Sequence, residues 1–297
     1  MKKHIRTLSV VPLAALAVSV CALYPSKTEI FTREPIYYKN AAMRLTAPSE
    51  PDTSAENITD PKSAILDKVL NTIDRLDRVY MTARTNMIGD GETTLTFDVD
   101  ISAGLSHQSV AENGVTVSET YSDTTVGMVR IDHKTKRYTP DYLPVYTRSD
   151  TPYIPLDERI TYEDGIPCYR YRRNITNCPL ASYCLVPQEL AFSVLSDTGS
   201  WEMSDERMVY PDTGRSCVVI TGVPSDYFAA KHRIDSFSMS VDEETGVILS
   251  FEGKKEGGVV IYTYVTEFDT APEAPVGRFD AAAFADYEQE KRQTALR

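Results

Sequence analysis

The hydrophobic residues of this chain change their spacing near Gly89-Asp90-Gly91, and this change constrains the fold more than any other feature. Between residues 60 and 80, apolar side chains recur every three or four positions, and Asp60-Pro61 suits the start of a helix. From residue 93 onwards, apolar and polar side chains alternate, which is typical of strands with one buried face. The sequence therefore predicts an α+β fold in which a helix of about twenty residues precedes the strands.

Strand and turn signals continue to residue 268. Asn113-Gly114 predicts a hairpin turn, and the segment 243–246 predicts another turn between two alternating stretches. Residues 187–195 fit a short helix that covers the sheet. Because the strands and the helices must hide their apolar faces against each other, we expect a curved antiparallel sheet. This sheet, a half-open β-barrel, would wrap around one long N-terminal helix and short covering helices.

The N-terminus has the pattern of an export signal. Basic residues precede an apolar run from Leu8 to Leu23, and Ala22 is a suitable residue for cleavage. Residues 1–24 are therefore predicted to be a signal peptide or an uncleaved N-terminal membrane anchor, and Cys21 leaves acylation as a third option. All three options place the rest of the chain outside the cytoplasm, either secreted or anchored to the cytoplasmic membrane.

Composition divides the remaining chain into three parts. Residues 25–59 are rich in Pro, Ser, Thr and charge, so we expect a flexible tether. Residues 60–270 hold the helix and strand signals and form the predicted domain. The tail 271–297 is weakly amphipathic, which fits a docked helix or a frayed end equally well.

Charge and cysteine content narrow the function classes. The 43 acidic and 31 basic residues give a net charge of −12, which repels phosphate backbones and disfavours nucleic-acid binding. In an oxidising compartment, four clustered cysteines predict two disulfides with three possible connectivities. A metal site is disfavoured because the cluster contains no Cys-x-x-Cys pair and no His. Our preferred pairing is Cys178–Cys184 and Cys168–Cys217.

Catalytic motifs are weak in this sequence. Asp197-Thr-Gly-Ser200 and Asp212-Thr-Gly214 match parts of the aspartic-protease pattern, but such enzymes need two symmetric halves or two chains. Two aspartates this close in sequence fit turns better. The chain has neither a Gly-x-Ser-x-Gly nor a His-Glu-x-x-His motif. We therefore predict that the protein is not an enzyme and has no cofactor and no metal site.

Three stretches resemble the LolA/RseB superfamily of extracytoplasmic proteins, which includes lipoprotein carriers, mycobacterial lipid-binding lipoproteins and envelope-stress sensors. They are the leading helix Ser63–Leu70, the segment Trp201–Ser204 with Gly214–Pro224, and the closing hairpin Ser236–Gly253 with Tyr262–Phe268. Together they cover roughly residues 62–270. The four clustered cysteines and the acidic insert between Asp141 and Asp164 depart from the compact carriers, and they put a simple carrier function in doubt.

The resemblance implies a half-open barrel with an apolar concave face, partly plugged by helices, that holds acyl chains without covalent chemistry. Residues on one side of the strands are the candidates for lining such a cavity: Leu95, Phe97, Val99, Ile101, Phe237, Met239, Val241, Leu249 and Phe251. Alternatively, the same side chains only pack on the helix.

Two functions follow from these expectations. The first is an extracytoplasmic, non-enzymatic binding protein that holds a lipid or a lipoprotein acyl chain in an apolar cavity. The second is a membrane-anchored, RseB-like sensor or regulator that binds another envelope protein.

Overall fold

The computed structural model describes residues 60–88, 91–125, 127–141, 145–164 and 166–290. The predicted signal peptide or anchor (1–24) and the predicted tether (25–59) lie outside these ranges, and both stay predictions. Within the described ranges, none of the helices combines the length and the apolar character that a membrane-spanning segment needs.

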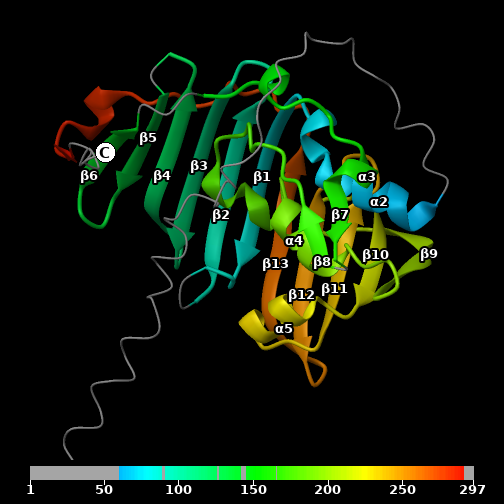
Figure 1. The fold of residues 1–297 in the computed structure, drawn as a ribbon. Coiled ribbons are helices and arrows are strands. Elements are labelled where there is room, and N and C mark those ends of the chain that lie inside the picture. Colours follow the sequence, from blue (N-terminus) through cyan, green and yellow to red (C-terminus); the bar gives the residue numbers. More distant parts are fainter. Residues whose placement is uncertain (1–59, 89–90, 126, 142–144, 165, 291–297) are drawn as a thin grey trace, which may run out of the picture. The chain divides into compact units, whose positions relative to one another are not determined.

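One large sheet dominates the described residues (Figure 1). Its twelve strands follow the order β14-β6-β5-β4-β3-β2-β1-β13-β12-β11-β10-β9, and neighbouring strands are antiparallel except for the parallel pair β14–β6. The predicted curved antiparallel sheet is confirmed, and it is unclosed because its edge strands β9 and β14 do not pair with each other. The strands are β1 (Arg78–Thr85), β2 (Thr93–Asp100), β3 (Leu105–Glu112), β4 (Val115–Asp123), β5 (Gly127–Asp132), β6 (Arg137–Asp141), β9 (Trp201–Val209), β10 (Ser216–Gly222), β11 (Ser236–Asp242), β12 (Ile248–Lys255), β13 (Gly258–Asp269) and β14 (Glu288–Gln289).

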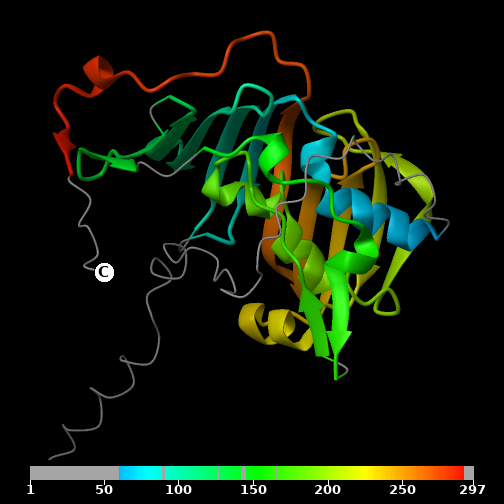
Figure 2. The same cartoon turned by 45° about the horizontal axis from the view of Figure 1, so that its top comes forward.

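Short helices and a separate hairpin complete the fold. Helices α2 and α4 contact each other and pack over one face of the sheet (Figures 1 and 2). The helices are α2 (Pro61–Leu70), η2 (Thr72–Asp74), η3 (Arg148–Asp150), α3 (Leu156–Arg159), η4 (Pro179–Tyr183), α4 (Gln188–Val194), α5 (Asp226–His232) and η5 (Ala281–Phe284). The hairpin consists of β7 (Ile160–Glu163) and β8 (Ile166–Tyr169).

The helix predicted between residues 60 and 80 is half as long in the structure. It begins as expected, because the Asp60 side chain accepts a hydrogen bond from the Ser63 amide at 3.0 Å. However, it ends at Leu70, and Val79 already belongs to β1, so the prediction of a long helix was wrong. The physical reason is Asn71, whose side-chain oxygen accepts hydrogen bonds from two buried arginines and holds the chain in a non-helical conformation.

The apolar side chains form two clusters between the sheet and the helices. One lies over β1, β2 and β3 and includes residues of η4. The other lies over β10, β11 and β12 and includes residues of α2 and α4. Because residues i and i+2 of a strand share a face, the buried positions alternate along β1 and β2. The sheet and its helical cover are therefore one packed unit.

The C-terminal tail is docked rather than frayed over its described part. Residues 281–284 form only the short helix η5, and Glu288–Gln289 pair with β6 as β14. Val276 is buried.

Candidate functional site

The nine residues predicted to line a cavity lie beneath the helical cover. Cross-strand pairing places Phe97 opposite Met81 and Phe251 opposite Met239, so these side chains lie on one face of the sheet. None of the nine side chains is more than 2% exposed: Leu95, Phe97, Val99, Ile101, Phe237, Met239, Val241, Leu249 and Phe251. The structure thus divides the nine residues between two apolar clusters, five in one and four in the other.

The cover packs directly on this surface. Phe97 belongs to the same cluster as Ala181 and Leu185, which come from η4 and the residues after it. Phe251 belongs to the cluster that contains Leu66 of α2 and Phe192 of α4. In this structure the strand side chains therefore pack on the helices. That these nine residues line a ligand cavity stays a prediction.

Two buried arginines join the parts of the cover. Arg159 and Arg172 both donate to the Asn71 side-chain oxygen, at 3.1 Å and 2.8 Å. The Arg159 guanidinium and the Arg172 amide also donate to Gln188 Oε1, at 2.6 Å and 2.7 Å. Arg172 forms an ion pair with Asp74. We call these five residues the arginine clamp, because they connect the end of α2, the end of α3 and the start of α4.

Burial controls the electrostatics of the clamp. Burial lowers the pKa of Arg159 to about 10, and the neighbouring charge of Arg172 acts in the same direction. Burial also raises the pKa of the Asp67 carboxyl, which accepts hydrogen bonds from Tyr153 at 2.9 Å and from Asn71 at 2.9 Å. Buried charges that lose a partner are costly, so the clamp resists separation of these segments.

The sequence carries no signal for the clamp. Arg159 follows the acidic pair Asp157-Glu158, which is the pattern of a solvated surface, yet its side chain is completely buried. Arg172 is similarly placed in a run of basic residues, next to Arg173. Their partners Asn71 and Asp74 lie about a hundred residues earlier in the chain, so only the fold reveals them.

All four cysteines of the described domain are free thiols in the structure. Cys178 and Cys184 flank η4 and are fully buried, and burial raises the pKa of both thiols to about 12. Cys184 Sγ lies 3.5 Å from Met81 Sδ, so it faces the sheet. Cys217 is buried in the same cluster, whereas Cys168 is partly exposed. The predicted pairing is not formed here and stays a prediction.

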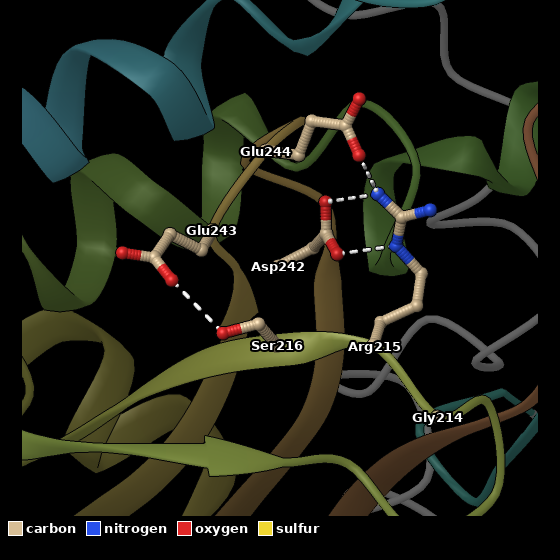
Figure 3. A pocket seen from close by; sticks show the side chains of 6 residues that line it. All are labelled: Gly214, Arg215, Ser216, Asp242, Glu243 and Glu244. Atoms are coloured by element: carbon tan, nitrogen blue, oxygen red, sulfur yellow. Dashed lines mark hydrogen bonds and ion pairs between the residues drawn. The ribbon is translucent and has the colours of Figure 1, made fainter.

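An open pocket of about 360 Å³ lies at the turn between β11 and β12 (Figure 3). Figure 3 shows Arg215 reaching towards two acidic side chains, and its guanidinium bonds Asp242 Oδ1 at 3.1 Å and Glu244 Oε2 at 2.6 Å. Ser216 Oγ donates to Glu243 at 2.9 Å. Because these charges already satisfy one another, the pocket offers a ligand little free polar chemistry.

A second pocket of about 320 Å³ lies near the end of β13 and is lined by acidic side chains that include Asp98, Glu267 and Asp269. Across the part of the chain that the structure describes, no group of three or more His, Cys, Asp or Glu side chains can hold a metal ion. Asp197 accepts a hydrogen bond from the Gly199 amide at 3.0 Å, so it stabilises a turn as expected.

Comparisons with known proteins locate the fold but not the function. No family model matches the chain, and no curated protein has a significantly similar sequence. An uncharacterised conserved protein from Thermus thermophilus matches 78% of this chain over 100% of its own, with 10% identity and a TM-score of 0.39. The lipoprotein LppX of Mycobacterium tuberculosis matches 74% of this chain over 100% of its own, with 14% identity and a TM-score of 0.35.

The Pseudomonas aeruginosa MucA/MucB complex also contains a similar chain, with 14% identity, a TM-score of 0.40 and a match over 73% of this chain. This chain spans 59% of that relative, or about three fifths of its length. The similar solved structures also include MucB and a LolA superfamily protein from Nitrosomonas europaea, and the likeness is one of fold alone. At identities of 14% or less and TM-scores below 0.5, this similarity carries no conclusion about function.

Proposed function

We propose that this chain is a non-enzymatic, extracytoplasmic binding protein that holds the acyl chain of a lipid or lipoprotein between the sheet and its helical cover. The observation that carries the proposal is the apolar face of the sheet, which holds the nine residues in two clusters and is covered by short helices rather than by a second sheet. A ligand would replace part of the cover as the apolar partner of this face.

A long apolar ligand offsets part of the energetic cost of such an exchange. Burial of each methylene contributes about 0.8 kcal/mol, so an acyl chain that replaces the contacts of η4 or α4 compensates for much of the lost packing. Strands β1 and β2 pair residue by residue along their length, whereas η4 and α4 are five and seven residues long. The cover is therefore the layer that we expect to move.

The position of the clamp indicates how the cover opens. Asn71 follows the last residue of α2, and Asp74 is the last residue of η2. Gln188 begins α4, and its side chain bonds both the main-chain amide and the main-chain carbonyl of Arg172. Separation of α4 from α2 requires these polar contacts to break. We infer that the clamp keeps the apolar face closed when no ligand is bound and sets the rate of opening.

A fluorescent fatty acid tests this proposal. We expect the purified full-length protein to raise the fluorescence of a dansylated fatty acid, and unlabelled fatty acid to reverse the increase. Asp74→Asn, which weakens the clamp, should accelerate uptake several-fold. Glu158→Gln breaks an exposed ion pair with Arg170 and should leave the uptake rate unchanged. No fluorescence change, together with no lipid in a solvent extract of the protein, would contradict the proposal.

A further inference from the structure

The C-terminal segment covers a second surface, on the side of the sheet away from the helical cover. Residues 276–290, which we call the C-terminal strap, run beyond the end of β13 to the outer edge of β6 (Figure 2). His107 lies between two buried residues that face the cover, Ser106 and Gln108, so its side chain points to the opposite face. Tyr121 on β4 lies opposite His107 in the sheet, so its side chain points to the same face as that of His107.

The surface beneath the strap is organised around one carboxylate. Glu119 Oε2 accepts hydrogen bonds from His107 Nε2 and the Tyr121 hydroxyl, both at 2.6 Å, and Glu119 Oε1 lies 2.7 Å from His133 Nε2. The rings of His107 and Tyr121 are stacked at 4.3 Å. All these contacts lie within β3, β4 and the turn after β5. The surface therefore keeps its internal hydrogen bonds when the strap leaves, and it is preorganised for binding.

The strap holds this surface with aromatic side chains. Phe279 contacts the ring of Tyr138 at 5.6 Å between centroids, and Phe284 contacts that of Tyr121 at 6.5 Å. The Tyr287 hydroxyl lies 2.7 Å from His133 Nδ1. Each aromatic side chain of the strap stays partly exposed.

Charge and main-chain pairing complete the attachment. Asp286 forms an ion pair with Lys136 at 2.7 Å, and Glu290 forms one with Arg137 at 2.7 Å. The amides of Glu288 and Glu290 donate to the carbonyls of Lys136 and Tyr138, both at 2.9 Å. These two ion pairs are exposed and the ladder is two residues long, so these contacts are individually weak. A third ion pair joins Arg278 of the strap to Asp123, whose side chain is only 9% exposed.

We propose that this surface is a recognition site for an extended acidic and aromatic segment of a partner protein, and that the strap occupies the site in competition with it. The strap itself shows which chemistry fits: aromatic rings on the His107–Tyr121 stack, and carboxylates on Lys136 and Arg137. When the strap leaves, the edge of β6 exposes main-chain groups that a new strand can pair with. This site is separate from the proposed acyl-chain site.

A labelled peptide with the sequence of residues 276–290 tests the proposal. In a full-length variant that carries Phe279→Ser, Phe284→Ser and Tyr287→Ser, the strap should release the surface. We expect fluorescence anisotropy to show at least tenfold tighter peptide binding to this variant than to the unaltered chain. A peptide with the same three substitutions should not bind. A control variant with Ala281→Ser, Ala282→Ser and Ala283→Ser, all at exposed positions, should behave like the unaltered chain.

Three results would overturn the proposal. The first is that the peptide does not bind the triple variant although this variant still unfolds cooperatively. The second is that the unaltered chain binds the peptide as tightly as the triple variant does. The third is that the peptide binds only when two chains exchange their straps in a dimer. If the triple variant does not fold, hydrogen exchange on the unaltered chain decides. The amides of Glu288 and Glu290 should exchange well before those of β4, and equal protection would contradict a displaceable strap.

Discussion

Arg172 and Asp74 form a two-point ion pair at the edge of the helical cover, in which Arg172 Nη2 bonds Asp74 Oδ1 at 2.9 Å and Nη1 bonds Oδ2. The two residues are 98 positions apart in the sequence. The Arg172 side chain is 1% exposed, whereas that of Asp74 is 29% exposed. The pair therefore fixes the end of η2 against the segment that leads into η4.

Asp74→Asn should destabilise the protein because it leaves the Arg172 guanidinium buried without its ionic partner. We expect the free energy of unfolding to fall by about 2 kcal/mol, less than for a fully buried pair because water reaches Asp74. Denaturation in urea measures this change. Glu158→Gln, at an ion pair whose partners are both more than half exposed, is the matched control and should change stability by less than about 0.5 kcal/mol.

Gly246→Ala should separate α2 from the turn between β11 and β12. Gly246 has φ +79°, and a Cβ there would lie 2.5 Å from the Lys68 carbonyl in α2. Gly257 has φ +81° but open space around it, so Gly257→Ala reports backbone strain alone, about 1 kcal/mol. We expect Gly246→Ala to lower the free energy of unfolding by clearly more than Gly257→Ala. Equal losses would show that the close approach to α2 contributes nothing.

Glu119→Gln should make the free energy of unfolding depend less on pH in the acidic range. Burial alone would raise the pKa of Glu119, but hydrogen bonds from His107, Tyr121 and His133 outweigh it and lower the pKa from 4.5 to about 2. Because the pKa is lower in the folded chain, this stabilisation is present above pH 4.5 and is lost as the pH falls towards 2.

At pH 7 the substitution should therefore cost on the order of 3 kcal/mol of unfolding free energy. The difference between the two proteins should shrink steadily below pH 4.5 and vanish near pH 2. Urea denaturation at several pH values measures it. A difference that does not change with pH would mean that Glu119 acts through packing and not through its charge.

The cysteine pairing can be tested on the exported protein. We expect Cys178 and Cys184 to be joined, because they flank one short helix within the same cluster, and Cys168 to be joined to Cys217. Alkylation under denaturing conditions without reductant, followed by peptide mass spectrometry, distinguishes bridged from free cysteines. Four alkylated cysteines in protein taken from an oxidising compartment would contradict the pairing, and native labelling should then begin at the partly exposed Cys168.

Local sequence patterns correctly predicted those elements whose conformation depends mainly on residues close in sequence. The alternation in residues 95–101 became β2, and Asn113 and Gly114 adopt the positive φ angles of 51° and 76° that their hairpin turn requires. The short helix expected at 187–195 is α4. In each of these elements, residues that are neighbours in sequence supply the hydrogen bonds or the hydrophobic period. Contacts with distant residues are therefore not needed to predict the element.

Distant contacts determined the features that the sequence did not reveal. The helix stops at Leu70 because Asn71 accepts hydrogen bonds from Arg159 and Arg172, and no local pattern reports those partners. The strap likewise docks through Phe284 onto Tyr121, which belongs to a strand far earlier in the chain. The nine residues predicted from the strand pattern are all buried in the structure, and that they line a ligand cavity stays a prediction.

Photolabelling distinguishes an acyl-chain site beneath the helical cover from adsorption on the surface. A fatty acid that carries a photoreactive diazirine near its methyl end is bound to the full-length protein, irradiated and mapped by peptide mass spectrometry. We expect labels on β2, on β11 or β12, and on the facing residues of η4 or α4, and we expect an excess of unmodified fatty acid to abolish them. Labels confined to exposed side chains, or labelling that excess fatty acid does not reduce, would contradict an acyl-chain site beneath the cover.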